Sequence, residues 1–360
     1  MTAPGSEDIE MGRALARSAE GKFMKDRSCA CFIIPPRVLR HLADKAQGQE
    51  RKDLLDSALL SEYLRGSRSV RGLLGITNVS GEKRRTVYDC AHRRSTPPRG
   101  KLVRAEGAAA VQDTAVNQAY DAAGTTYDFY HTVLKRNSID ARGMRLDSFV
   151  HFGKKFNNAF WDGAEMTYGD GDGKLFTGFT NALDVVAHEL THGVTQFSTP
   201  GGLDYTDQSG ALNESISDVF GSVVKQWSRK ETVGDADWLI GKGIMSPGVG
   251  HALRSMKAPG DAAVTWDGDD QPSTMDGYVE GGDVHTNSGI PNHAFYLAAM
   301  ALGGHSWDKA AKIWYASLRM LPSDATFEDA AKATSNAATH LFGTKERAAV
   351  DDAWKKVKVT

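Results

Sequence analysis

The chain has 360 residues, and at about 150 residues per domain this length predicts two or three domains. Apolar residues make up 41% and charged residues 24%, which is typical of a globular protein and excludes a collagen-like or wholly disordered chain. With 43 basic and 45 acidic residues, the net charge of −2 provides no global field that would attract nucleic acid. The cysteines Cys29, Cys31 and Cys90 are too few, and odd in number, for a disulfide scaffold.

The N-terminal residues 1–23 do not have the pattern of a cleavable secretion signal. Acidic residues stand where a signal peptide begins with basic residues and continues with an apolar run. The longest apolar stretches, such as Ala294–Leu302, are far shorter than the roughly 20 residues that a membrane-spanning helix needs. We therefore expect no membrane insertion, and either secretion by a non-classical route or a cytoplasmic location.

The predicted secondary structure changes along the chain from a strand-rich part to a helix-rich part. Residues 82–104 are strongly basic and are expected to form an exposed linker or an edge hairpin, with a processing-sensitive boundary or a binding patch as alternatives. Residues 100–180 combine one helix, Ala115–Lys135, with several strand signals. The helices predicted after Ala182 are Leu183–Phe197, Ala211–Trp227, Pro291–Leu302, Ser306–Leu321, Phe327–Leu341 and Lys345–Lys356. This order predicts an α+β fold with two lobes.

The segment His188-Glu189-Leu190-Thr191-His192 has the spacing of a metal-binding helix. Residues four apart lie on the same helix face, so the imidazoles of His188 and His192 can bind one metal ion. Glu189 would then lie beside the metal, where it can take a proton from the attacking water. Because a five-residue match can also arise by chance from two unrelated histidines, the surrounding sequence has to decide.

The next predicted helix supplies the third ligand that a catalytic zinc requires. The residues after His192 lack the further glycine and histidine of a metzincin. Glu214 and Asp218 lie on one face of the following helix among apolar neighbours, and buried carboxylates need a cation to offset their desolvation. We expect Glu214 to bind the metal and Asp218 to hold one ligating imidazole by its other nitrogen.

These two motifs together resemble the thermolysin family of zinc metalloendopeptidases. The second motif is Gly210–Gly221, and the resemblance extends over residues 100–360. Further matching stretches are Asn157–Trp161, Met166–Gly173, Asp184–Ala187, Leu253–Met256 and His285–Gly289. The resemblance implies a two-lobed zincin fold with the active-site cleft between a strand-rich N-terminal lobe and a helical C-terminal lobe.

The resemblance also implies roles for individual residues. One zinc ion would be held by His188, His192 and Glu214, with Glu189 as the general base. The donors that stabilise the oxyanion would be Tyr205 and His285. The groups that hold the substrate main chain would be Asn158, the backbone of Ala159, and Arg254. The pocket on the primed side would be lined by Phe176, Phe179, Val185, Ile240 and Leu253. Because this pocket is apolar, we expect cleavage before bulky apolar residues.

The sequence departs from the family at the paired calcium site. Asp184 and Asp237 match residues of that site, but Lys225, Leu239 and Lys242 stand where the family has carboxylates. An ammonium group supplies no oxygen ligand and brings its own positive charge. We therefore expect no calcium here, with Lys225, together with Lys242, replacing the ion.

A second departure concerns the catalytic histidine. Glu280 stands where the family has an aspartate that orients this side chain. Either the longer side chain of Glu280 or the nearby Asp283 is expected to orient His285.

The N-terminal residues 1–70 resemble the short propeptide of the protealysin-like branch of the family. Pro35, Pro36 and Leu39 stand where that branch carries its Pro-Pro motif and would lie in or near the cleft. The resemblance implies a precursor that is inhibited by its own propeptide and is cut between about 65 and 86; a mere N-terminal extension is the alternative. Cys29 or Cys31 could ligate the zinc in the latent form, but the resemblance gives no support for this, so both are treated as reduced thiols.

The leading hypothesis is a monomeric zinc endopeptidase, acting on protein or peptide substrates and made as a zymogen. Its expected parts are a propeptide-like region 1–75, a strand-rich catalytic lobe 76–200 that includes the zinc-binding helix, and a helical catalytic lobe 201–360. A zinc aminopeptidase is disfavoured because the Gly-x-Met-Glu-Asn element is absent. A catalytically silent, zinc-stabilised binding protein is disfavoured because Glu189, Tyr205 and His285 are all present.

Overall fold

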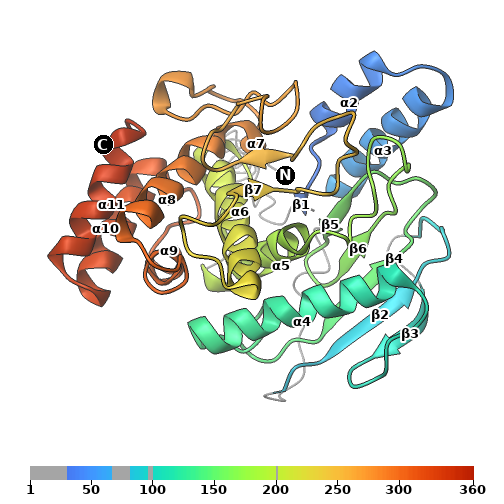
Figure 1. Ribbon diagram of the computed structural model, residues 1–360, viewed down its shortest axis with the longest axis horizontal. Coiled ribbons are helices and arrows are strands. Elements are labelled where there is room, and N and C mark those ends of the chain that lie inside the picture. Colours follow the sequence, from blue (N-terminus) through green and yellow to red (C-terminus); the bar gives the residue numbers. More distant parts are fainter. Residues whose placement is uncertain (1–30, 67–81, 96–99, 200–201) are drawn as a thin grey trace, which may run out of the picture.

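The structure is a computed structural model, and it describes residues 31–66, 82–95, 100–199 and 202–360 (Figure 1). In the described residues, six strands form one sheet in the order β1-β5-β6-β4-β2-β3. These strands are β1 (Cys31–Phe32), β2 (Arg85–Asp89), β3 (Lys101–Ala105), β4 (Leu146–Val150), β5 (Ala159–Trp161) and β6 (Met166–Tyr168). Strand β2 runs parallel to β4, and β4 runs parallel to β6, while the other neighbouring pairs are antiparallel.

The two ends of this sheet come from different parts of the chain. The basic segment 82–104 contributes β2 and β3, and β3 forms one edge, as expected for an edge hairpin. The other edge is β1, from the region predicted to be a propeptide, which pairs with β5 in the register Cys31↔Trp161. An N-terminal segment therefore completes a sheet that the later part of the chain builds.

Two helices follow β1 and pack beside the sheet (Figure 1). They are α2 (Pro36–Lys45) and α3 (Gly48–Gly66), which contact each other. Pro36 occupies the first position of α2, where a missing N–H group is tolerated because it would have no partner inside the helix. Val38, Leu39 and Leu42 are buried and belong to the same apolar core as the catalytic part.

The centre of the molecule is a pair of helices, α5 (Leu183–Ser198) and α6 (Asp207–Arg229), with α4 (Thr114–Leu134) beside them (Figure 1). Glycines permit the close packing of this pair. A Cβ atom on Gly221 of α6 would lie 2.6 Å from the carbonyl oxygen of Asp184 on α5. A Cβ atom on Gly193 would lie 2.4 Å from a methyl group of Ile139 and 3.0 Å from the ring of Trp161. The Gly221 contact sets the distance between the two helices that carry the predicted metal ligands, and Gly193 allows α5 to approach Ile139 and β5.

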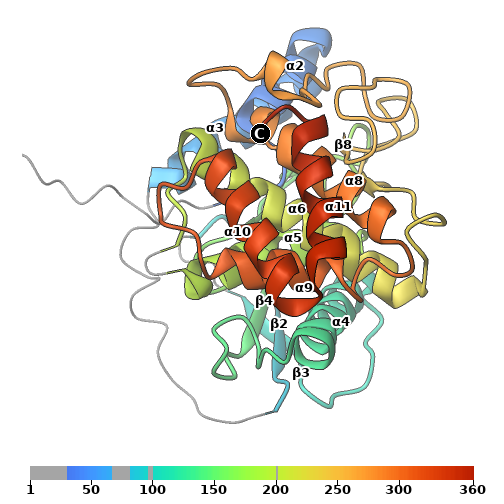
Figure 2. The same ribbon diagram turned by 90° about the vertical axis from the view of Figure 1, so that its left-hand side faces the viewer.

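The remaining elements form the helical lobe, and Figure 2 looks onto its outer helices. They are β7 (Leu239–Ile240), β8 (Arg254–Ser255), a 3-10 turn (Met275–Gly277), α7 (Val284–Asn287), α8 (Gly289–Leu302), α9 (Ala310–Leu318), α10 (Phe327–Leu341) and α11 (Thr344–Lys356). Helices α8, α9 and α10 contact α6. No helix in the described residues is long and apolar enough to cross a membrane.

The predicted helices are confirmed, and the largest differences lie at the start of α6 and at the two ends of α9, which stops at Leu318 rather than at Leu321. Helix α6 begins at Asp207 rather than at Ala211. The sequence did not predict this first turn because its residues are polar and show no apolar periodicity. Helix α9 begins at Ala310 rather than at Ser306. The hydroxyl of Ser306 instead donates to Oε1 of Gln226 at 2.7 Å, which ties the preceding turn to α6.

Candidate active site

Three buried side chains from α5 and α6 converge on one point. Nε2 of His188 lies 3.0 Å from Nε2 of His192 and 3.4 Å from Oε2 of Glu214, and Nε2 of His192 lies 3.5 Å from Oε1 of Glu214. Ligand atoms bound at 2.0–2.2 Å to one tetrahedral zinc lie roughly 3.3–3.6 Å apart. The spacing of the three side chains therefore suits one zinc ion.

The protonation of the two imidazoles gives a second test of this fit. Nδ1 of His188 is 2.8 Å from Oδ1 of Asp218, and Nδ1 of His192 is 2.9 Å from Oδ1 of Asn213. If each Nδ1 carries the proton and donates it, both Nε2 atoms are bare acceptors. They then face each other and the carboxylate of Glu214 with no proton to share, so a cation is required between them.

Without a metal ion, the only cation that the cluster could hold is a proton. Burial lowers the pKa of His188, but the hydrogen bonds with Asp218 and Glu214 outweigh it and raise the pKa to about 9. Burial raises the pKa of Glu214, yet the charges of His285 and His192 hold it well below the ordinary value. The raised pKa of His188 and the lowered pKa of Glu214 have one cause, because this cluster contains more hydrogen-bond acceptors than donors.

Asp218 is held in turn by a buried network. Nε and Nη2 of Arg254 donate to its two oxygens at 2.9 and 2.8 Å, and Nδ2 of Asn292 donates at 2.9 Å. Burial raises the pKa of Asp218, but Arg254 and His188 outweigh that effect and lower it below the ordinary range. Asp218 is thus a fixed carboxylate whose Oδ1 contacts Nδ1 of His188.

Glu189 lies beside the ligands and is poised to accept a proton. The backbone N–H of Trp161 donates to its Oε2 at 3.0 Å, while its buried Oε1 has no hydrogen-bond partner among the described residues. Burial is the main cause that raises the pKa of Glu189 to about 8. One oxygen is therefore oriented by the backbone and the other is open for chemistry.

The two predicted oxyanion donors, Tyr205 and His285, both contact Oε1 of Glu214. The hydroxyl of Tyr205 donates to Oε1 of Glu214 and lies 3.4 Å from Nε2 of His285. Nδ1 of His285 is 2.8 Å from Oδ1 of Asp283, the residue that caps α7.

The proposed role of Glu280 is wrong. The Glu280 side chain is exposed, and Asp283 takes the orienting position. Asp283 is only two residues from His285 and caps the short helix α7, so its carboxylate reaches both the backbone N–H and the ring of the histidine.

The predicted substrate-holding groups contact the main chain of residues 32–34. Oδ1 of Asn158 accepts from the N–H of Ile34 at 2.9 Å, and its Nδ2 donates to the carbonyl of Ile34 at 2.8 Å. The N–H of Ile33 donates to the carbonyl of Ala159 at 3.2 Å, and Nη1 of Arg254 donates to the carbonyl of Ile33 at 3.4 Å. The N-terminal segment therefore occupies the place assigned to a substrate.

The five residues assigned to the primed-side pocket are buried together. Phe176 and Phe179 have ring centroids 5.8 Å apart. All five belong to the main apolar core, and so do Ile33 and Leu39: Phe176, Phe179, Val185, Ile240 and Leu253. Pro35 and Leu253, with Arg254 and His285, line one small cavity. Pro35 thus lies at the cleft, while Pro36 and Leu39 belong to α2.

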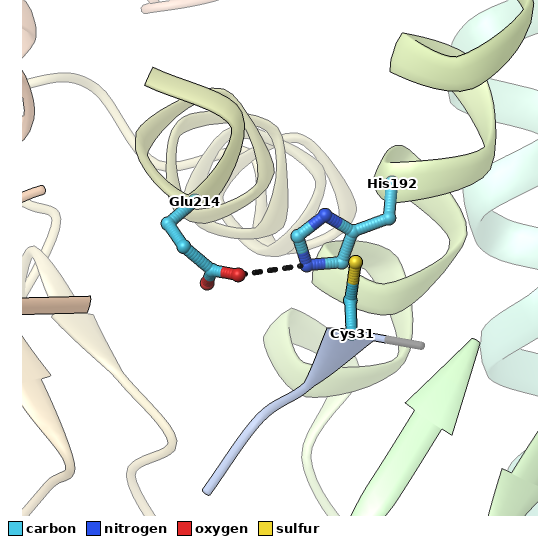
Figure 3. Close-up of side chains that lie close together, drawn as sticks. All are labelled: Cys31, His192 and Glu214. Carbon is cyan, nitrogen blue, oxygen red and sulfur yellow. Dashed lines mark ion pairs between the residues drawn. The ribbon is translucent and has the colours of Figure 1, made fainter. Parts of the chain in front are cut away.

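The sequence offered Cys31 only as a zinc ligand without support from the family resemblance, and it did not reveal that Cys31 lies at this cluster. Its sulfur, a nitrogen of His192 and a carboxylate oxygen of Glu214 all lie within 4.8 Å of one another. Figure 3 shows Cys31, at the start of β1, beside the imidazole of His192 on α5, with Glu214 on the other side of that imidazole. The only signal in the sequence was the chemistry of the thiol itself. Cys29 and most of the predicted processing interval lie outside the described residues.

The supporting residues Asn213 and Asn292 were also missed. Asn213 immediately precedes Glu214 in the matched segment, so its place next to the site could have been inferred from the motif. Asn292 has no comparable signal, because only the folded chain brings it from α8 to Asp218.

A second ionic cluster lies between the same two helices. Nζ of buried Lys225 donates to Oδ2 of Asp184 at 3.0 Å, to Oδ1 of Asp237 at 2.9 Å and to the carbonyl of Leu239 at 2.5 Å. Lys242 is exposed and lies 3.5 Å from Asp237. Burial lowers the pKa of Lys225, but the two aspartates outweigh it and raise the pKa above its ordinary value.

The fold and the cluster of two histidines, two glutamates and oxyanion donors define a zinc-dependent peptidase. The chain matches the thermolysin metallopeptidase catalytic domain over residues 76–196 and the thermolysin metallopeptidase alpha-helical domain over residues 201–359. It therefore belongs to the thermolysin family, and its fold is thermolysin-like, with strands in the N-terminal part and a helical C-terminal domain.

Named relatives cover almost the whole chain. It is 45% identical over 348 residues to an extracellular metalloprotease of Pectobacterium carotovorum subsp. carotovorum, a match that covers 93% of this chain and 98% of the relative. It is 40% identical over 349 residues to protease PrtS of Photorhabdus sp., which covers 91% of each. The solved structure of the protealysin precursor from Serratia proteamaculans matches with a TM-score of 0.82 and 45% identity, over 92% of this chain and 100% of that one.

Proposed function

We propose that the chain is a zinc endopeptidase made as a zymogen, and that its mature form cleaves before bulky apolar residues. The observation that supports the zymogen proposal is the position of the main chain of residues 32–34. Their main chain is held by Asn158, Ala159 and Arg254 in the place assigned to a substrate. A segment held in this way excludes any other peptide from the cleft.

The described residues suggest a division of labour for hydrolysis. A zinc ion held by His188, His192 and Glu214 would polarise the substrate carbonyl and lower the pKa of the attacking water. Oε1 of Glu189 would accept the proton of that water, with Oε2 kept in place by the N–H of Trp161. Once Tyr205 no longer donates to Glu214, its hydroxyl and Nε2 of His285 would donate to the oxyanion, and each such donor contributes about 10²–10³ in kcat.

The apolar pocket supports the proposed specificity. Its five residues are at most 2% exposed, and burying a side chain such as leucine or phenylalanine there contributes about 1.5–3 kcal/mol. A charged side chain would lose its hydration without gaining a partner. Digestion of a peptide library by the mature enzyme should therefore give cuts before leucine, isoleucine and phenylalanine. A preference for acidic or basic residues after the cut would contradict the proposal.

Proteolysis itself can be tested on casein with an isosteric variant. Glu189→Gln should abolish digestion, because the amide cannot accept the proton, and chelation of zinc should do the same in the wild type. Glu328→Gln is the matched control, since Glu328 is exposed and pairs only with Lys332 at the surface. Full activity in Glu189→Gln would contradict the proposed mechanism.

The zymogen proposal predicts autoprocessing. Wild-type precursor should lose its N-terminal region on incubation, with a new N-terminus between about 65 and 86, whereas the Glu189→Gln precursor should stay intact. Equal trimming of both chains would mean that another protease is responsible.

Two further proposals concern calcium and location. We propose that Lys225 replaces calcium, because its ammonium group already satisfies Asp184 and Asp237. We also propose that the protein is secreted, supported by the relative named as an extracellular metalloprotease. Immunodetection of the precursor and mature forms in medium and cell fractions tests the second proposal.

A further inference from the structure

The segment from Cys31 to Ile34 is held like a substrate with one particular peptide bond at the centre of the site. The carbonyl oxygen of Phe32 lies 3.2 Å from Nε2 of His285, one of the two proposed oxyanion donors. The next carbonyl, of Ile33, accepts from Arg254. The bond between Phe32 and Ile33 thus occupies the position of a bond to be cut, with an apolar residue after it.

This arrangement raises a physical problem for a precursor that stays intact. A substrate-like peptide beside Glu189 and a zinc-bound site should be hydrolysed. The same strand, however, carries Cys31 directly before Phe32, and its sulfur lies within 4.8 Å of the ligand atoms of His192 and Glu214.

Resting on the function proposed above, we propose that in the precursor the thiolate of Cys31 is the fourth zinc ligand, and that it protects the Phe32–Ile33 bond by taking the place of the attacking water. The thiol releases its proton to solvent, the sulfur binds the metal, and the displaced water leaves. His188 and His192 contribute nitrogen, Glu214 an oxygen and Cys31 a sulfur, which gives the four ligands of a closed zinc site.

The strand pairing explains why this sulfur reaches the cluster. Successive side chains of a strand point to opposite faces. Phe32 packs on Phe160, with ring centroids 5.0 Å apart, so Cys31 points the other way, toward α5. The pairing of Cys31 with Trp161 holds its backbone in register, and Cys31 is only 3% exposed.

Charge and donor type favour the same arrangement. A zinc ion with two neutral imidazoles and the Glu214 carboxylate keeps one net positive charge in a buried place. The thiolate neutralises that charge, which lowers the cost of burial. Thiolate is also a strong ligand for zinc, and sulfur and nitrogen ligands of one tetrahedral zinc lie about 3.5 Å apart.

X-ray absorption on the zinc-loaded precursor tests the ligand directly. Glu189→Gln serves as the parent because it should remain uncut. We expect one sulfur at about 2.3 Å from zinc in this parent, loss of that sulfur in Glu189→Gln with Cys31→Ser, and its retention in Glu189→Gln with Cys29→Ser. The proposal would be overturned if zinc in the parent is bound by nitrogen and oxygen alone, or if the sulfur is lost with Cys29→Ser. Either result would leave the proposed function as a zinc peptidase unaffected. A precursor that binds no zinc would instead contradict the proposed function.

A second measurement follows the fate of the bond. With Glu189 present, the Cys31→Ser precursor should be cut between Phe32 and Ile33 and should disappear faster than wild type, with Ile33 as a new N-terminus. The same lifetime and the same N-termini in both chains would show that the thiol protects nothing.

Discussion

Two buried ionic clusters lie along the same pair of helices, and they obtain their cation in different ways. Near the start of α5, Asp184 meets the ammonium group of Lys225 from α6. One turn further along α5, His188 meets Glu214, and the atoms that converge there are acceptors. The first cluster contains its cation within the chain, whereas the second has to take one from solution.

The difference follows from what each cluster has to do. A tethered ammonium satisfies buried carboxylates permanently, but it cannot polarise a carbonyl or bind the attacking water. A zinc ion does both, at the cost of a site that can be emptied. We infer that the chain supplies its own cation, Lys225, at the first cluster, and that the second cluster takes a zinc ion from solution for hydrolysis.

The largest effect should come from removing zinc, with calcium depletion as the comparison. Zinc removal should abolish proteolysis and lower the melting temperature of the Glu189→Gln precursor, because three acceptors lose their shared cation. Depletion of calcium at constant free zinc should leave the melting temperature unchanged. A large drop on calcium depletion would refute the role given to Lys225.

The internal cation can also be removed. Lys225→Met removes the ammonium group shared by buried Asp184 and half-buried Asp237, so we expect the free energy of unfolding to fall by about 3–5 kcal/mol. Lys242→Met is the matched control, because this lysine is exposed and its ion pair is worth at most about 1 kcal/mol. Urea unfolding of both variants in the Glu189→Gln precursor checks the difference, and equal losses would contradict it.

The sequence predicted most of the catalytic cluster, because its residues lie in local motifs. His188 and His192 are one helical turn apart, and Glu214 and Asp218 repeat that spacing on the next helix. Local spacing also predicted the helices, apart from the polar first turn of α6 and the two ends of α9.

Contacts between distant segments were beyond the sequence pattern. Cys31 reaches His192 only because β1 pairs with β5, and Asn292 reaches Asp218 only because α8 packs on α6. The sequence left Glu280 and Asp283 as alternatives, and the cap of α7 decides between them because it places the shorter side chain of Asp283 against His285.

The orienting carboxylate of the zinc cluster should have an intermediate effect. In Asp218→Asn the amide can no longer act as a charged acceptor for Nδ1 of His188, so zinc affinity should fall about 10–100-fold. Competition with a chelator measures this, with the exposed Asp324→Asn as a control for the change in charge. Unchanged affinity would mean that Asp218 serves only to hold Arg254.

A histidine outside both clusters should show the smallest effect and a defined dependence on pH. Nδ1 of His151 is 2.8 Å from Oδ1 of Asp170, and its Nε2 is 2.9 Å from Oδ2 of Asp113, which caps α4. The hydrogen bond with Asp170, helped by Asp113 and opposed by burial, raises the pKa of His151 to about 9. His92 also faces Asp170, at 3.4 Å.

Because the folded pKa lies above the ordinary value of about 6.5, the charged imidazole stabilises the fold fully below that pH, and the contribution disappears as the pH rises toward 9. Partial exposure limits it to about 1 kcal/mol. The unfolding free energy of the Glu189→Gln precursor should therefore decline between pH 6.5 and 9 more steeply than that of the same chain with His151→Gln. The exposed His340→Gln should follow the parent. Parallel curves for parent and His151→Gln would show that a neutral His151 holds the α4 cap equally well. The contrast between a cation supplied by the chain and one taken from solution would then apply only to the two clusters between α5 and α6.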